Sequence, residues 1–111
     1  MTTTTKKVFI ESKFAEITET TQYTAVNCKA EIDKFTAVNV TGINATLTVK
    51  LVKSGDTPSA VHQLPPVTIA PGKSWPFPDA VAQLLEAGGF ISTIAGTASA
   101  ISIRSVGREY T

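Results

Sequence analysis

The feature that most constrains the fold is an alternation of apolar and polar residues, with a period of two, in short segments that end at turn-forming residues. Between residues 29 and 40, small and apolar side chains occupy one set of alternate positions and charged or amide side chains the other. From 45 to 53, leucine and valine alternate with threonine and lysine. This period is typical of half-buried β-strands. Residues 41 to 44 (Thr-Gly-Ile-Asn) supply a turn, so we predict that the two segments form a β-hairpin.

The alternation reverses once, at Lys34 and Phe35. A β-bulge would insert one extra residue here, or Phe35 would point outward at an interface. We favour a bulge or an ordinary edge contact over an outward aromatic interface.

Six further extended segments are predicted, at residues 8 to 10, within 14 to 23, at 64 to 70, 74 to 77, 90 to 95 and 100 to 106. Pro71-Gly72 predicts a type II turn, because proline presets the first central φ and glycine accepts the positive one. Residues 54 to 59 contain glycine and proline among other turn formers and predict a loop.

One short helix is predicted over residues 79 to 89. Asp79 could cap its first turn, three aliphatic residues share one face, and Gly88-Gly89 could end it. Seven or eight short strands with one short helix predict an all-β, single-domain β-sandwich, either jelly-roll or immunoglobulin-like. We expect residues 8 to 111 to form this domain and residues 1 to 7 to be a flexible N-terminal arm.

The charge balance limits the classes of partner. Ten Lys and Arg against nine Asp and Glu give a formal net charge of +1, and charged residues make up only 17% of the chain. Proteins that neutralise many phosphates carry a basic stripe, so no nucleic-acid partner is expected. No segment has the length of a signal-peptide core or a membrane span, so we expect a soluble chain made in the cytoplasm, with no membrane partner.

The titratable residues predict no enzyme. His62 and Cys28 are the only histidine and the only cysteine, and the common nucleophile, zinc-protease and phosphate-loop motifs do not occur. His62 is interpreted as a loop histidine, and Cys28 as filling a small space at a strand start. Glu31 and Asp33 should point the same way from one strand, where a solvated face is favoured over a glycosidase or calcium site. We therefore predict no catalytic residue, cofactor, metal or small-molecule substrate.

Two segments predict contacts with other protein chains. Residues 74 to 78 (Ser-Trp-Pro-Phe-Pro) carry the only tryptophan, a residue enriched at interfaces but as often a lid on a core. The threonine-rich start buries little, and we expect it and residues 104 to 111 to be ordered only by a neighbouring chain. The candidate partner-binding residues are Thr2, Thr3, Thr4, Thr5, Lys6, Lys7, Trp75 and Phe77.

A series of strand and turn motifs runs from residue 23 to the C-terminus. It includes Tyr23-Thr-Ala25, Ile32-Asp-Lys-Phe-Thr36, Ala45-Thr-Leu-Thr-Val49, Ile69-Ala-Pro-Gly72, Gly88-Gly89, Ala98-Ser-Ala100 and Ile103-Arg104. In order and spacing this series resembles a family of small structural proteins from the virions of tailed bacteriophages.

The resemblance implies a β-sandwich subunit present in many copies on a virion. A capsid decoration (cement) protein is favoured, with a neck or tail accessory protein as the alternative. The implied partners are copies of the protein itself and other virion proteins, foremost the major capsid protein. The family pattern has a short aliphatic helix after the Pro-Gly turn, matched by residues 80 to 86, whereas Cys28 and the aromatic segment 75 to 78 depart from it.

A hypothesis of a different class is a glycan- or receptor-binding module of the virion. In that case Trp75, Phe77 and Tyr110 would stack on sugars. Such tips usually follow a long fibrous stalk, which this sequence does not contain.

Overall fold

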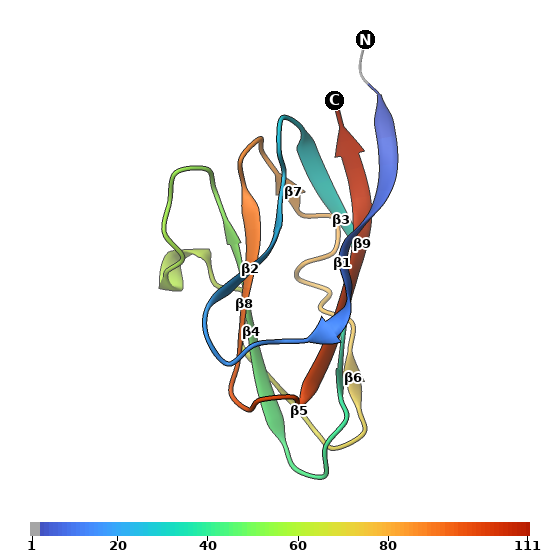
Figure 1. Cartoon of the computed structure of the whole chain (residues 1–111), viewed down its shortest axis with the longest axis vertical. Helices are drawn as coiled ribbons and strands as arrows, with labels where there is room; N and C mark the ends of the chain where they lie inside the picture. The colour runs from blue at the N-terminus through green and yellow to red at the C-terminus, as the bar shows by residue number, and fades with distance from the viewer. Residues whose placement is uncertain (1–2) are drawn as a thin grey trace.

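The computed structural model describes residues 3 to 111, which form two antiparallel β-sheets packed face to face (Figure 1). The strands are β1 (Thr4–Phe14), β2 (Thr20–Thr24), β3 (Lys29–Asn39), β4 (Ala45–Val52), β5 (Val67–Ile69), β6 (Ser74–Trp75), β7 (Leu84–Leu85), β8 (Phe90–Ala95) and β9 (Ile101–Tyr110). A single 3-10 turn, η1 (Ala60–His62), follows β4 among the described residues. The predicted all-β sandwich is confirmed.

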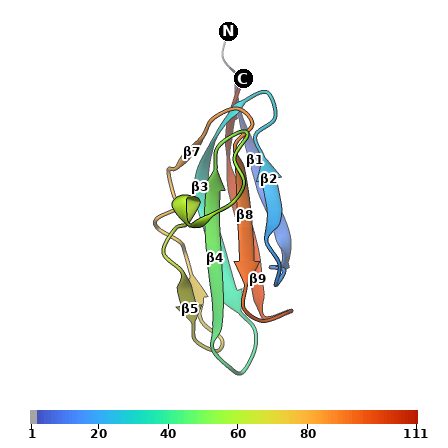
Figure 2. The same cartoon turned by 90° about the vertical axis from the view of Figure 1, so that its left-hand side faces the viewer.

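The strand order is that of a jelly roll. One sheet has the order β1-β9-β3-β6, with β7 also paired to β3, and the other has the order β2-β8-β4-β5. Figure 2 looks onto the second sheet, with the first behind it. Strands therefore pair from the two ends of the chain inward, β1 with β9, β2 with β8, β3 with β6 and β4 with β5. This is one long hairpin wrapped into two sheets, and of the two predicted topologies it is the jelly roll.

The predicted β-hairpin is wrong, although both of its strands exist. β3 belongs to the first sheet and β4 to the second, so residues 40 to 44 cross between the sheets. The turn after β5 also crosses, and it has the expected form, since Lys73 N donates to Ala70 O at 3.0 Å and Gly72 has a φ of 70°. Alternation tells which side of a strand is buried but not which sheet the strand joins.

The predicted helix over residues 79 to 89 is also wrong. This segment forms turns and β7, which lies along the edge of β3 opposite Ala30 and Glu31. Ile32 N donates to Gln83 O at 3.0 Å, and Ala82 N donates to Ile32 O at 2.6 Å. A helix of two turns is marginal by itself, whereas the extended segment satisfies backbone groups at the edge of β3. Nowhere in residues 3 to 111 is there a helix of the length and apolarity that crossing a membrane requires.

The N-terminal segment differs from the flexible arm that we expected. β1 begins at Thr4, opposite Tyr110, and continues in regular register to Val8 opposite Val106. Thr3 and Thr111 exchange two backbone hydrogen bonds, of 2.7 and 2.9 Å. The two ends of the chain thus order each other, and β9 lies between β1 and β3 up to Tyr110. Thr2 lies outside the described residues.

The core lies between the sheets and explains the broken alternation in β3. A register shift between Ile32 and Lys34 marks a bulge at Asp33, one of the two favoured interpretations of the inversion at Lys34 and Phe35, and this bulge turns Phe35 inward. Phe35 is completely buried. Below it, the buried Asn39 side chain donates to Ile43 O and Ile69 O and accepts from Thr41 N. Asn39 therefore connects the ends of three strands at the pole of the sandwich away from the termini.

Candidate binding surface

The outer face of the first sheet, at the end near the chain termini, combines an ion-pair cluster with an open depression. Two cross-strand rows define it, Lys6–Arg108–Glu31 and Val8–Val106–Lys34, followed toward the termini by Thr4–Tyr110–Lys29. The alternate residues of β9, among them Ile103, Ser105 and Gly107, are buried, so the row residues point away from the core. We call this surface the terminal face.

An ion-pair cluster holds the centre of the terminal face. Arg108 donates through Nε and Nη2 to the Asp33 carboxylate, at 2.9 to 3.2 Å, and through Nη2 to Glu31 at 3.2 Å. The Tyr110 hydroxyl donates to Glu31 Oε1 at 3.0 Å. Hydrogen bonding to Asp33 raises the pKa of Arg108, and hydrogen bonding to Glu31 raises the pKa of Tyr110. Glu31 and Asp33 do share a face, as predicted, but they are bound to an arginine instead of being solvated.

Beside this cluster is an open depression of about 380 Å³, lined by Lys6, Lys7, Val8, Asp33, Lys34, Val106 and Gly107. Val8 and Val106 are half-buried neighbours across β1 and β9 and provide apolar surface. Lys6 and Lys34 are exposed on either side, and neither has an acidic group within ion-pair distance in residues 3 to 111. The depression thus combines apolar surface with two uncompensated positive charges.

The inward side of the same strands is fixed by a second cluster. The Tyr23 hydroxyl donates to the Glu109 carboxylate, Lys7 Nζ lies 3.4 Å from it, and the Tyr23 and Phe9 rings stack at 4.1 Å between centroids. Burial and the Glu109 charge raise the pKa of Tyr23, while the hydrogen bond from Tyr23 lowers the pKa of Glu109. Cys28 is buried nearby, and burial raises the pKa of its thiol. This cluster ties β9 to the second sheet and gives the terminal face a rigid support.

Tyr23→Phe should lower the free energy of unfolding at neutral pH by about 1.5 to 3 kcal/mol, because it removes a hydrogen bond to a half-buried charged group, the Glu109 carboxylate. The lowered pKa of Glu109 stabilises the fold above the ordinary pKa of 4.5, and this contribution is lost as the pH falls through the folded-state pKa. The deficit of the variant should therefore shrink below about pH 4.5, as measured by urea unfolding across pH. Tyr110→Phe, on the outer face, is the matched control and should show little pH-dependent difference; a constant deficit for Tyr23→Phe would contradict the assignment.

The predicted aromatic contact site is not formed. Phe77 is 1% exposed and packs edge-on against Phe35, with 5.1 Å between ring centroids. Its assignment to a partner surface is therefore wrong, and its backbone φ of 45° reflects the sharp turn that inserts the ring into the core. Trp75 is 38% exposed on β6, at the opposite edge of the sheet from β1.

Trp75 and Tyr110 are too far apart to stack on one sugar. Trp75 pairs with Ala37 and Tyr110 with Lys29, eight positions away along β3. At about 3.3 Å per residue this is a separation of about 26 Å. The structure therefore does not bring Trp75, Phe77 and Tyr110 together as the glycan-stacking hypothesis requires.

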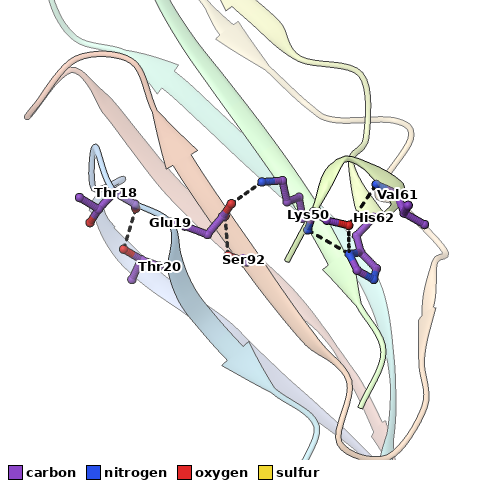
Figure 3. A network of polar contacts seen from close by, with 8 residues as sticks. Thr18, Glu19, Thr20, Lys50, Val61, His62 and Ser92 are labelled. Carbon is purple, nitrogen blue, oxygen red and sulfur yellow. Dashed lines mark hydrogen bonds and ion pairs between the residues drawn. The ribbon is translucent and has the colours of Figure 1, made fainter. Parts of the chain in front are cut away.

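The outer face of the second sheet carries a smaller polar cluster, shown in Figure 3. The Glu19 carboxylate accepts from Lys50 Nζ and from Ser92 Oγ, the latter at 2.6 Å. Burial opposes ionisation of Glu19, but the hydrogen bonds from Lys50 and Ser92 outweigh it, so the pKa of Glu19 is lowered. The three residues come from the segment before β2, from β4 and from β8, and they fasten the β1–β2 connection to the sheet.

A serine, a histidine and an aspartate also meet in the loop after β4. His62 Nε2 lies 3.0 Å from Asp56 Oδ2, and Ser59 Oγ lies 3.4 Å from His62 Nδ1. A hydrolase triad uses the same residue types. Here, however, His62 Nδ1 accepts from Ser59 N at 3.2 Å, and Ser59 Oγ accepts from Val61 N, which is a capping box for η1. The expected hydrogen-bonded loop histidine is confirmed, and Figure 3 shows its contacts with the cap.

The structure brings together only some of the predicted partner-binding residues. Thr3 lies beside Thr111, while Thr4, Thr5, Lys6 and Lys7 lie on β1, away from Trp75. Sequence reasoning missed Lys34, Val106 and Arg108 as parts of the same surface. The available signal was the apolar-polar alternation of β9, which continues past Val106 with Arg108 and Tyr110 on the polar side.

No protein-family model, no curated protein and no solved structure matches this chain. Groups of three or more residues suited to holding a metal ion do not occur in the part of the chain that the structure describes. The structure shows an all-β sandwich whose terminal face carries an ion-pair cluster beside an open depression.

Proposed function

We propose that the protein is a bacteriophage virion structural protein, foremost a capsid decoration (cement) protein that binds the head shell. The observation that carries this proposal is the terminal face, where Arg108 and Tyr110 are held in place beside an apolar depression. Arginine and tyrosine are enriched among residues that dominate binding energy, and side chains that are already ordered lose less entropy on binding. A neck or tail accessory role is the alternative.

The fold is compatible with a virion role but does not distinguish that role from others. Jelly rolls occur in viral capsid proteins but also in lectins and cupins, so fold alone does not define function. Among these classes, the sequence resemblance to virion proteins supports a viral structural protein. With the three aromatic residues dispersed, a receptor-binding module has less support, and we propose no catalytic activity or cofactor.

Contacts between copies of the protein are proposed on the flank formed by β6 and β7, which we define by Trp75, Val81 and Leu84. These three side chains are 38 to 50% exposed, and Trp75 and Leu84 lie on short strands that pair with the same edge of β3. Pairing of two β1 edges is disfavoured, because Lys6 and Lys7 would face their counterparts across the new strand pair. Register shifts after Val8 and after Ile10 further protect that edge.

The proposal is tested by co-sedimentation of the purified protein with particles of the parent phage that lack it. We expect saturable binding at a fixed ratio to capsid subunits, and cryo-electron density on the shell. Arg108→Ala should reduce retention on particles at least tenfold, as expected for a hot-spot residue. Arg104→Ala is the control, since Arg104 lies on the same strand outside the terminal face and pairs only with the exposed Glu11. A protein that stays monomeric and never pellets with particles would overturn the proposal.

A further inference from the structure

We infer that the depression of the terminal face binds an acidic segment of a partner protein, one that places an apolar side chain between two carboxylates. The inference rests on the proposed binding role of this face and adds the chemistry of the partner. It is carried by the distribution of paired and unpaired charges over the molecule, together with the apolar lining of the depression.

The protein is nearly neutral in total, but more of its cations than of its acids lack a partner of opposite charge. Seven of the nine acidic residues lie within ion-pair distance of a lysine or an arginine; Asp56 contacts only His62, which is counted as neutral at pH 7, and Asp79 has no partner in residues 3 to 111. Four cations have no acidic partner in residues 3 to 111, namely Lys6, Lys34, Lys53 and Lys73. Two of these four, Lys6 and Lys34, line the same depression. The nearest guanidinium, that of Arg108, pairs with both Asp33 and Glu31, so this cluster carries a net charge of −1, and the two lysines leave the depression and its border net positive.

The positions of the two lysines set the geometry of the partner. Lys6 is on β1 and Lys34 on β3, with β9 between them, so their strands are about 10 Å apart. Val8 and Val106 form the apolar surface in this space. An extended Glu-x-Val-x-Glu segment puts its two carboxylates about 13 Å apart on one side, with the valine between them. Lysine side chains are long and flexible enough to meet that spacing.

The charges favour a foreign protein segment over the two other occupants. A second copy of this chain offers two acids without a lysine or arginine partner, Asp56 and Asp79, and these lie 23 positions apart instead of on one short extended segment. Nucleic acid is disfavoured because two lysines neutralise too few phosphates to hold it at physiological salt.

The test is an NMR titration of the purified protein with the synthetic peptide Thr-Glu-Thr-Val-Thr-Glu-Thr at low salt. We expect shifts confined to amides of β1, β9 and β3 around Val8, Val106 and Lys34, with a Kd of about 1 mM or tighter. The double variant Lys6→Glu, Lys34→Glu should weaken binding at least tenfold. The matched double variant Lys53→Glu, Lys73→Glu changes the net charge equally and should leave the affinity within about twofold.

Three results would overturn the inference. They are no shifts up to about 5 mM peptide, equal binding of the peptide with glutamine in place of glutamate, or equal losses in the two double variants. Retention of the same variants on phage particles separates this inference from the proposed function. If the double variant Lys6→Glu, Lys34→Glu still binds particles, the depression is not the particle-binding site, but the proposed virion role stands. If the parent protein binds the peptide but never binds particles, the acidic-segment inference stands and the proposed virion role is wrong.

Discussion

Gly107→Ala is expected to lower the free energy of unfolding by about 3 kcal/mol, a large share of the roughly 5 to 15 kcal/mol by which domains of this kind are stable. Gly107 lies in the middle of β9 and faces inward between Lys7 and Ile32. A Cβ atom at this position would come closer than 3.0 Å to the Glu31 carbonyl oxygen and to the Phe9 ring. Neither can move easily, because Glu31 O belongs to the backbone of β3 and Phe9 is stacked on Tyr23.

Chemical denaturation monitored by circular dichroism measures this effect. Gly42→Ala is the control, since an added Cβ there meets nothing within 4 Å. We expect the control to stay within about 0.5 kcal/mol of the parent protein. Similar, small effects of both substitutions would mean that β9 shifts to make room, and the tight approach of β9 to β3 would then be wrong.

Phe35→Ala should cost about 3 to 5 kcal/mol, the usual range for removing a fully buried phenylalanine. Phe35 is completely buried, and its ring meets Phe77 edge-on at an interplanar angle of 62°. Its loss would leave a cavity bordered by the strained backbone turn that holds Phe77. Phe14→Ala removes the same ring from a site that is 47% exposed, and it should cost less than about 1 kcal/mol. Comparable losses in the two variants, measured by urea unfolding, would place Phe35 outside the core.

The sequence predicted individual strands well because a strand leaves its signature in local alternation. Val49 and Ile103 alternate with polar neighbours, and each was assigned to a strand that the structure contains. A bulge was among the favoured interpretations of the inverted pattern at Lys34 and Phe35, and the structure places it at Asp33. Pairing between strands left no such local signal, so the proposed hairpin after β3 joined two strands that belong to different sheets.

The two segments predicted wrongly both depend on a distant strand. Residues 79 to 89 have caps and an aliphatic face suited to a helix, but the exposed edge of β3 offers hydrogen bonds to Ala82 and Gln83 that a short helix cannot match. Thr4 and Thr5 look like a mobile arm until β9, about a hundred residues later in the chain, is known to lie beside them. Of the residues on the terminal face, Lys6 was among the predicted partner-binding residues, whereas Arg108 reaches the face only through the pairing of β1 with β9.

The two ends of the chain leave the sandwich side by side, from adjacent antiparallel strands (Figure 1). A force that pulls on both ends would therefore act across the hydrogen bonds between β1 and β9 one pair at a time, like the opening of a zipper. Anchored through its broad sheet face instead, the same domain would share the load over many side-chain contacts at once. For a protein proposed to bind a head shell, attachment through the sheet face would therefore withstand a larger force than attachment through the two ends of the chain.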